Sequence, residues 1–278
     1  MSSVQYKIYD TFSYNGEEIA LIRVQYLYNT IHTFIIIEAR ETHSGGIKTE
    51  LYFEKNKVLF APYMDKIKYI IIDSFDIIKK IPEYNKNMLW KPEIWMLPTS
   101  YDSWCREHYQ RDFASEYLNS LPKNEDYLLY CGDVEEIPCK SIFKDLKNIY
   151  TEGGLIHLEM SIYIYNYKWK KIYKWCYPFI TTRKNLAKYS LTKLRNMMPT
   201  NDSPYIINGG WKCMYFQSYD EIYRMIESSS HREYDDDKYK NIFHIKSCIE
   251  NGKDIFNRGC LENGIENKDL DNLPELKI

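Results

Sequence analysis

The sequence predicts an α/β fold in which a mostly parallel central sheet is flanked by helices. Short runs rich in β-branched and aromatic residues alternate with segments whose apolar residues recur at helical spacing. The runs are apolar at nearly every position, which is typical of strands covered on both faces. No stretch rich in Gly, Ser or Pro divides the 278 residues, so one large domain is expected.

The first half follows this alternation in order. YKIYDTF is the first expected strand, and the helix after it carries Glu17 and Glu18 near its positive end. IHTFIIIEA and KIKYIIID are the next strands, because β-branched residues dominate both. A later helix has an apolar side chain at every fourth position. In chain order, the expected strands and helices cover residues 6–12, 16–30, 31–39, 66–73, 102–121, 127–130 and 138–148.

The second half has a different pattern. Residues 155–175 alternate between apolar and polar side chains, as long antiparallel strands do. Helices are expected over residues 219–228 and 234–251. The polar residues 261–278 are expected to form a tail.

The composition excludes some partners. Lys plus Arg is 37 and Asp plus Glu is 39, so the formal net charge of −2 gives no reason to expect nucleic acid. The seven Cys form no Cys-x-x-Cys pair, which favours reduced thiols over a zinc site. The amino terminus lacks the pattern of a signal peptide, and the apolar runs are too short to span a bilayer. We therefore expect a soluble, cytoplasmic protein.

An apolar strand over residues 127–130 leads directly into three carboxylates, Asp133, Glu135 and Glu136. The carboxyl ends of strands in open α/β sheets are where ligands bind. Carboxylates this close repel one another unless water, a basic partner or a metal ion compensates. Asp133-Val134-Glu135 resembles the Asp-x-Asp signature of nucleotide-sugar glycosyltransferases, in which a divalent ion bridges the donor's phosphates. A solvated acidic turn is the alternative.

Further motifs lie in a fixed order along the chain. After the segment from Tyr9 to Ile70 come REHYQRDF, DVEEIP, GGWKC, SHREY and IENGKDIFNR. Together, over residues 6–258, they resemble glycosyltransferase family 17, which includes the enzyme that adds the bisecting N-acetylglucosamine of N-glycans. The resemblance implies a GT-A-type fold and a single catalytic domain over residues 1–260. Residues up to about 135 would bind the nucleotide sugar, and the rest would face the acceptor.

The activity that the resemblance implies is an inverting, metal-dependent transfer from a UDP-sugar, usually UDP-N-acetylglucosamine, to a glycan hydroxyl. Two positions depart from the family pattern. Glu135 stands where the family usually has Asp, and Lys212 stands where it commonly has His. The longer Glu135 side chain keeps the charge but moves the carboxylate, so the metal geometry is expected to differ. The acceptor or phosphate contact at Lys212 is also expected to change.

The predicted metal ligands for Mn²⁺ or Mg²⁺ are Asp133, Glu135 and His231, because carboxylates and neutral imidazole both suit these ions. The resemblance and the strand ends suggest the donor-binding residues Asp10, Glu38, Gln110, Arg111, Asp133, Arg224 and Arg258. Structural roles remain open beside these. Asp10 and Glu38 could cap loops, and Arg111 could pair with Asp133 instead of phosphate. Glu136 is expected to cap a helix after Pro138.

An inverting transfer needs a base that deprotonates the acceptor hydroxyl. Glu233 is the predicted base because it lies in the SHREY motif, with Asp202 and Glu159 as alternatives. Trp211 is predicted to contact the acceptor, since its flat ring can cover the apolar face of a sugar. Asp202 is also predicted to contact the acceptor, because it lies in an expected loop before the Gly-Gly-Trp segment. Core packing is the alternative for Trp211.

Two other classes of function stay open. A catalytically impaired carbohydrate- or nucleotide-binding protein would explain Glu135 and Lys212. A metal-dependent phosphoesterase would also use clustered carboxylates. Ile, Lys, Asn and Tyr are abundant, as AT-rich coding favours, and no membrane anchor is expected. Both features favour a microbial or viral enzyme, with a nucleotide sugar and a glycan acceptor as its partners.

Overall fold

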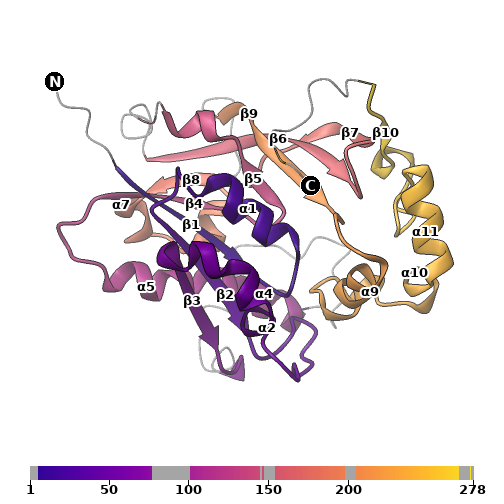
Figure 1. Ribbon diagram of the computed structural model, residues 1–278, viewed down its shortest axis with the longest axis horizontal. Coiled ribbons are helices and arrows are strands. Elements are labelled where there is room, and N and C mark those ends of the chain that lie inside the picture. The colour runs from indigo at the N-terminus through magenta and orange to yellow at the C-terminus, as the bar shows by residue number, and fades with distance from the viewer. Residues whose placement is uncertain are drawn as a thin grey trace.

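The structure, a computed structural model, describes residues 6–76, 101–144, 146, 154–197, 205–268 and 276. Their strands form one mixed sheet of ten strands, with helices packed on its two faces (Figure 1). Eight of the strands follow the order β10-β7-β6-β8-β4-β1-β2-β3, while β9 pairs with β5 and β6. The predicted α/β class is therefore confirmed, and one sheet runs through both halves of the chain.

The first half supplies the parallel part of the sheet. Its strands are β1 (Lys7–Ser13), β2 (Thr33–Ala39), β3 (Ile67–Ile72) and β4 (Tyr127–Cys131). All their pairings are parallel, with β1 between β4 and β2, and β3 beyond β2. The predicted strands are confirmed to within two residues, because β-branched runs buried on both faces carry a strong local signal.

Helices cover both faces of this parallel part. Alternate residues of β2 join two separate clusters, since side chains of a strand point to opposite faces. Phe34 and Ile36 pack with α1 (Ile19–Leu27) and α2 (Tyr52–Phe60). Ile35 and Ile37 pack with α4 (Tyr101–Asp112) and α5 (Ala114–Ser120), which together replace the single helix predicted over 102–121. A short 3₁₀ helix, η1 (Ala61–Lys66), leads into β3.

The second half adds mostly antiparallel strands. β8 (Phe179–Thr182) pairs with β4 and so joins the halves. β6 (Leu155–Ile164) pairs antiparallel with β7 (Trp169–Trp175), as predicted over residues 155–175. It also pairs antiparallel with β8 and parallel with β9 (Tyr205–Met214). β10 (Ile265–Glu266) pairs with β7, so this part of the predicted tail belongs to the sheet.

The helix predicted over residues 138–148 is wrong at its beginning. Glu136–Pro138 form strand β5, which pairs antiparallel with β9, and a 3₁₀ helix, η4 (Lys140–Lys144), follows. The pairing explains Gly210 of β9. A Cβ at Gly210 would lie 2.3 Å from the carbonyl oxygen of Ile137, so β5 can approach only glycine here. Residues 145, 147 and 148 lie outside the described residues.

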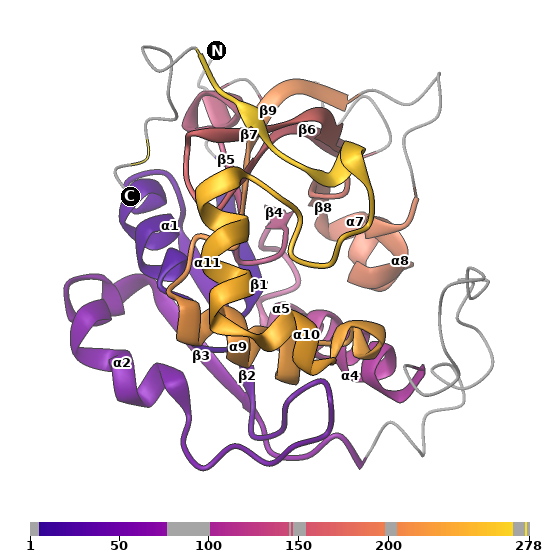
Figure 2. The same ribbon diagram turned by 90° about the vertical axis from the view of Figure 1, so that its right-hand side faces the viewer.

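The remaining helices lie mainly in the last third of the chain. Figures 1 and 2 show α9, α10 and α11 grouped at one end of the sheet. Ser218 and Glu221 form a reciprocal capping box at the start of α9, and Asn241 separates α10 from α11 by capping the latter. Within the described ranges, every helix is too short or too polar to cross a bilayer. The bounds are α7 (Arg183–Leu186), α8 (Leu191–Arg195), α9 (Tyr219–Ser228), η5 (Arg232–Tyr234), α10 (Asp237–Lys240), α11 (Ile242–Asn251) and η6 (Cys260–Glu262).

Candidate active site

Three segments that follow parallel strands meet at one edge of the sheet. They are the turn 14–17 after β1, the loop 40–47 after β2 and the segment 132–136 after β4, which we call the acidic loop. Because these strands run in the same direction, their carboxyl ends lie together, and this is where ligands bind in open α/β sheets. The edge is therefore the candidate active site.

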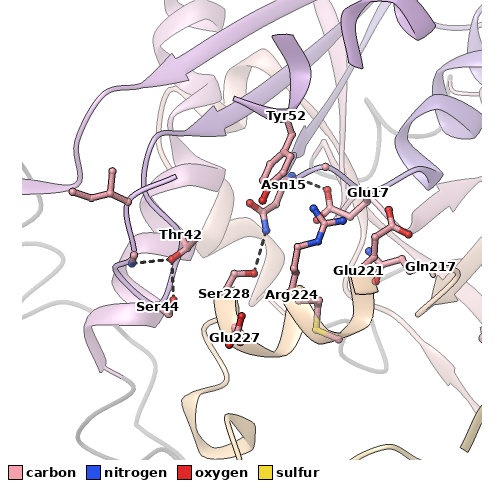
Figure 3. A pocket seen from close by; sticks show the side chains of 14 residues that line it. Asn15, Glu17, Thr42, Ser44, Tyr52, Gln217, Glu221, Arg224, Glu227 and Ser228 are labelled. Atoms are coloured by element: carbon pink, nitrogen blue, oxygen red, sulfur yellow. Dashed lines mark hydrogen bonds between the residues drawn. The ribbon is translucent and has the colours of Figure 1, made fainter. Parts of the chain in front are cut away.

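A pocket of about 260 Å³ opens between the first two of these segments and α9 (Figure 3). We call it the strand-end pocket. Helix α9 closes one side, because Asn15 Nδ2 donates to Ser228 Oγ at 3.2 Å and Ser44 N donates to the Ser228 carbonyl at 3.1 Å. The pocket is lined by Asn15, Gly16, Glu17, Thr42, Ser44, Gly46, Ile47, Tyr52, Gln217, Glu221, Arg224, Met225, Glu227 and Ser228.

One of the predicted donor-binding residues, Arg224, lies in this pocket. Its guanidinium carbon is 5.6 Å from the centre of the Tyr52 ring, and Figure 3 shows the group pointing toward Tyr52 and Glu17. A guanidinium group binds phosphate or carbonyl oxygens, and an aromatic ring offers a stacking surface to a base. The pocket therefore has the chemistry to hold a nucleoside with attached phosphate.

Glu17 gives the protein a predictable pH dependence. Burial raises its pKa from 4.5 to about 7, Asn15 N–H opposes this by donating at 2.6 Å, and Glu135 adds to the rise. Between pH 4.5 and about pH 7, Glu17 keeps a proton in the native protein that it releases in the unfolded chain, so the stability of the native protein falls as the pH rises. From about pH 5 to about pH 8, we expect the Tm of the wild type to fall more steeply than that of Glu17→Gln. Equal slopes in calorimetry would contradict the shift.

Asp133 lies in the acidic loop between two arginines. Its Oδ1 is 3.1 Å from Arg111 Nη2, and its Oδ2 is 2.7 Å from Arg195 Nη2. Burial acts to raise the pKa of Asp133, but Arg195 and Arg111 outweigh it and hold the pKa well below its usual range. The side chain is still 37% exposed, so an ionised carboxylate faces the site.

Glu136 has a different role from the predicted helix cap. Its carboxylate is fully buried and accepts from Arg195 at 2.8 and 2.9 Å, from Trp175 Nε1 at 2.5 Å and from Lys212 Nζ at 3.2 Å. It also accepts from the backbone N–H of Asp133 at 2.7 Å, which fixes the loop. The prediction that Glu136 caps a helix is wrong because the residue begins strand β5 instead.

The two residues that depart from the family pattern contact each other. Lys212 Nζ lies 2.8 Å from Glu135 Oε1 and 4.2 Å from the centre of the Trp175 ring. Lys212 stands opposite Glu136 in the β5–β9 pairing, which brings its side chain to the acidic loop. Burial acts to lower the pKa of Lys212, but Glu135 and Glu136 raise it above its usual value, so the side chain is an ammonium ion.

Asp10 and Glu38 face the interior instead of a ligand. Asp10 is fully buried and pairs with Arg23 at 2.5 and 3.0 Å, while Arg23 Nη1 donates to the Asp133 carbonyl at 2.6 Å. Glu38 is also fully buried and accepts from the backbone N–H groups of Tyr52 and Phe53 at the start of α2. A direct donor contact predicted for either carboxylate is therefore wrong. The two residues support the framework of the site.

Gln110 and Arg111 both lie on α4. Gln110 is buried and bonds His43 Nε2 and the Ile37 carbonyl, each at 2.8 Å, which ties α4 to the loop after β2. Arg111 pairs with Asp133, one of the alternatives left open by the sequence. It also lines a small cavity with Ser13 and Asp133.

His231 and Glu233 form a pair beside α4. Glu233 Oε1 lies 2.5 Å from His231 Nδ1, and the Trp104 ring packs edge-on against the imidazole at 4.7 Å between ring centres. Ser230 donates to Glu107, whose carboxylate also accepts from Arg111 at 2.8 Å. The segment around His231 is thus linked through α4 to Asp133.

The remaining predicted residues lie away from these contacts or outside the described residues. Trp211 packs edge-on against Tyr26 of α1, on the face of β9 opposite Lys212, which is the core-packing alternative. Arg258 binds Asp254 at 2.6 Å and lies over the Tyr234 ring. Glu159 is half-buried on β6. Asp202 lies outside the described residues.

Sequence reasoning missed the roles of Arg23, Arg195 and Trp175. Arg23 had a local signal, because it is a charged residue within the apolar helix sequence IALIRVQYL. Arg195 and Trp175 reach Glu136 from 59 and 39 residues away, and no local pattern marks them. The excess of carboxylates in the acidic loop predicted that basic partners exist, but not which ones.

The structure thus places a pocket and an acidic loop at the carboxyl edge of the parallel strands, where open α/β sheets bind ligands. The chain belongs to glycosyltransferase family 17, a family of N-acetylglucosaminyltransferases whose model matches residues 1–262. The resemblance inferred from the motifs is therefore confirmed.

Comparison with solved structures finds the crystal structure of mouse xyloside xylosyltransferase 1, apo form. The similarity covers 59% of this chain and 54% of that chain, with 13% sequence identity and a TM-score of 0.32. The match thus spans about half the length of the xylosyltransferase. None of the curated protein sequences compared with this chain matches it.

Proposed function

We propose that the protein transfers N-acetylglucosamine from UDP-N-acetylglucosamine to a hydroxyl group of a glycan, with inversion at the anomeric carbon. Family membership supports the donor class. The observation that carries the proposal is the strand-end pocket beside the acidic loop, at the carboxyl edge of β1, β2 and β4. A nucleotide sugar needs these two neighbouring environments, one for the nucleoside and one for the diphosphate and sugar.

The strand-end pocket would hold the nucleoside. Tyr52 offers a ring surface, Arg224 a cation, and Asn15, Thr42 and Ser44 short polar side chains for hydrogen bonds. The diphosphate would then extend toward the acidic loop. This direction is supported by the small cavity lined by Ser13, Arg111 and Asp133, because Ser13 lies two residues before Asn15 of the strand-end pocket. Arg111, in the small cavity beside Asp133, would donate to a phosphate oxygen.

The acceptor hydroxyl would attack the anomeric carbon as the bond to the diphosphate oxygen breaks, and UDP would leave. The hydroxyl proton must go to a base. Glu233 stays the proposed base, and the structure adds a partner. His231, 40% exposed, contacts the less exposed Glu233 at 2.5 Å, so the proton would reach Glu233 directly or through the imidazole. The link through Glu107 and Arg111 to Asp133 supports a position beside the donor.

Glycosyltransferases generally use a divalent metal ion, which neutralises the leaving diphosphate. The sequence assigned Mn²⁺ or Mg²⁺ to Asp133, Glu135 and His231. In the structure, Asp133 is held by two arginines, Glu135 by Lys212 and His231 by Glu233. A divalent ion would have to break these contacts before it could bind all three ligands. The donor set therefore does not fit the ion, and no step of the proposed reaction uses it.

The proposal is tested by incubating the protein with UDP- and other nucleotide sugars and a glycan panel, followed by UDP release and mass spectrometry of the products. For Asp133→Asn we expect the transfer rate to fall by about 100- to 1000-fold, because the two arginines lose their shared carboxylate in the site. The fold should survive, since Arg195 keeps Glu136 and Arg111 keeps Glu107. Asp126→Asn, on the exposed residue before β4, is the matched control and should match the wild type.

Each other outcome would replace the proposal. Full activity of Asp133→Asn would remove the acidic loop from the reaction. Binding of a nucleotide sugar by the wild type without any UDP release would favour the catalytically impaired binding protein. Turnover of phosphodiesters in place of transfer would favour the phosphoesterase.

A further inference from the structure

Each basic side chain at the acidic loop bridges two carboxylates. Arg111 Nη2 binds Glu107 at 2.8 Å and Asp133 at 3.1 Å. Arg195 Nη2 binds Asp133 at 2.7 Å and Glu136 at 2.8 Å. Lys212 Nζ binds Glu135 at 2.8 Å and Glu136 at 3.2 Å. Three cations thus connect four carboxylates into one continuous ionic network.

The network compensates most of the negative charge without an added ion. Four carboxylates and three basic groups leave one net negative charge, whereas the carboxylates alone would carry four. The side chains of Arg111, Arg195 and Lys212 are 10%, 7% and 6% exposed, so water screens these contacts little. Separating one of these buried ion pairs would leave an uncompensated charge in the protein, which costs free energy. The three cations are therefore expected to stay in their places.

Lys212 has the position of a bridging cation. Its ammonium group lies between Glu135 and Glu136, within 2.8 and 3.2 Å of their oxygens, as an ion shared by two carboxylates would. Trp175 holds this arrangement from one side, because its ring lies 4.2 Å from the ammonium and its Nε1 donates to Glu136. The cation is therefore part of the polypeptide and packed into the site.

We propose that Lys212, together with Arg195 and Arg111, takes the place of the divalent ion by offsetting the carboxylates of the acidic loop beside the donor diphosphate, so that donor binding and transfer need no added metal. The inference rests on the proposed function, since it concerns how that donor is held. The offset lowers the repulsion between the carboxylates and the diphosphate, and guanidinium groups such as those of Arg111 and Arg195 can donate N–H groups to phosphate oxygens.

The test compares the wild type in EDTA and in Mn²⁺. UDP binding is measured by isothermal titration calorimetry, and transfer by UDP release. We expect UDP affinity and transfer rate to differ by less than about twofold between the two conditions. In Lys212→Met, Glu135 and Glu136 lose their cation, so UDP affinity in EDTA should fall by at least about tenfold and Mn²⁺ should restore part of it. Lys174→Met, on an exposed lysine of β7, should behave as the wild type.

The outcomes separate this inference from the proposed function. If the wild type binds and transfers only with Mn²⁺, the inference is wrong and the proposed function stands. If UDP and nucleotide sugars fail to bind under both conditions, the proposed function is wrong as well. If Lys212→Met does not fold, the wild-type comparison decides alone, and Lys212→Arg, which keeps the charge, should remain independent of Mn²⁺. An Arg variant that requires Mn²⁺ would count against the inference.

Discussion

Replacing Arg23 by Met is expected to lower the free energy of unfolding by about 3–5 kcal/mol, which corresponds to a fall in Tm of roughly 10 °C. Arg23 and Asp10 are both fully buried, and their two contacts measure 2.5 and 3.0 Å. The variant leaves the Asp10 carboxylate without its cation in the core. It also removes the Arg23 donor from the carbonyl groups of Asp133 and Val134, so the acidic loop should loosen.

Denaturant unfolding of matched variants checks this expectation. Arg40→Met is the control, because Arg40 pairs with Asp73 on the surface and should cost less than about 1 kcal/mol. The double variant Arg23→Met, Asp10→Leu should recover much of the loss, since it removes both charges together. A single variant Arg23→Met as stable as the wild type would show that the buried pair contributes nothing.

Replacing Glu233 by Gln is expected to lower kcat by about 100- to 10,000-fold while the affinity for UDP stays within about twofold. The substituted amide keeps the size of the side chain but cannot take up the proton of the acceptor hydroxyl. The nucleoside side of the site, around Tyr52 and Arg224, does not include Glu233. Steady-state kinetics together with calorimetric UDP binding separate the two effects.

The matched control is Glu250→Gln, an exposed residue on α11, which should leave both quantities unchanged. Because Glu233 also orients His231, a loss of stability is a competing explanation for low activity. An unchanged Tm with lost kcat supports the role as base. Lost UDP binding in parallel with kcat would assign Glu233 to structure instead.

The fold was predictable where the chain carries its own signal. β2 is apolar at successive positions because both of its faces are buried, so periodicity alone marks it as a covered strand. β5 and β9 carried no such signal. β9 contains two glycines and several polar residues, and it forms a strand because β5 and β6 pair with it. Propensity says little about a strand that tertiary contacts create.

The candidate site was likewise predictable only in part. The acidic loop was predictable because its carboxylates are adjacent in sequence and follow a buried strand. The direction of each side chain was not, since that depends on partners elsewhere in the chain. Glu136 turns inward toward Arg195 and Lys212, and Asp10 turns toward Arg23. The two family departures, Glu135 and Lys212, could be read separately from the sequence, but only the β5–β9 register shows that they touch.

The walls of the strand-end pocket come from opposite ends of the polypeptide. Asn15 and Ser228, which join across it, are separated by 213 positions. During synthesis, the strand-end pocket therefore remains incomplete until α9 has left the ribosome and docked. A nucleotide that binds there would contact both the first and the last third of the chain. Because only the complete, folded protein has this pocket, the free energy of binding would add to the stability of that state. A ligand in the pocket would therefore hold these two distant segments of the chain in place.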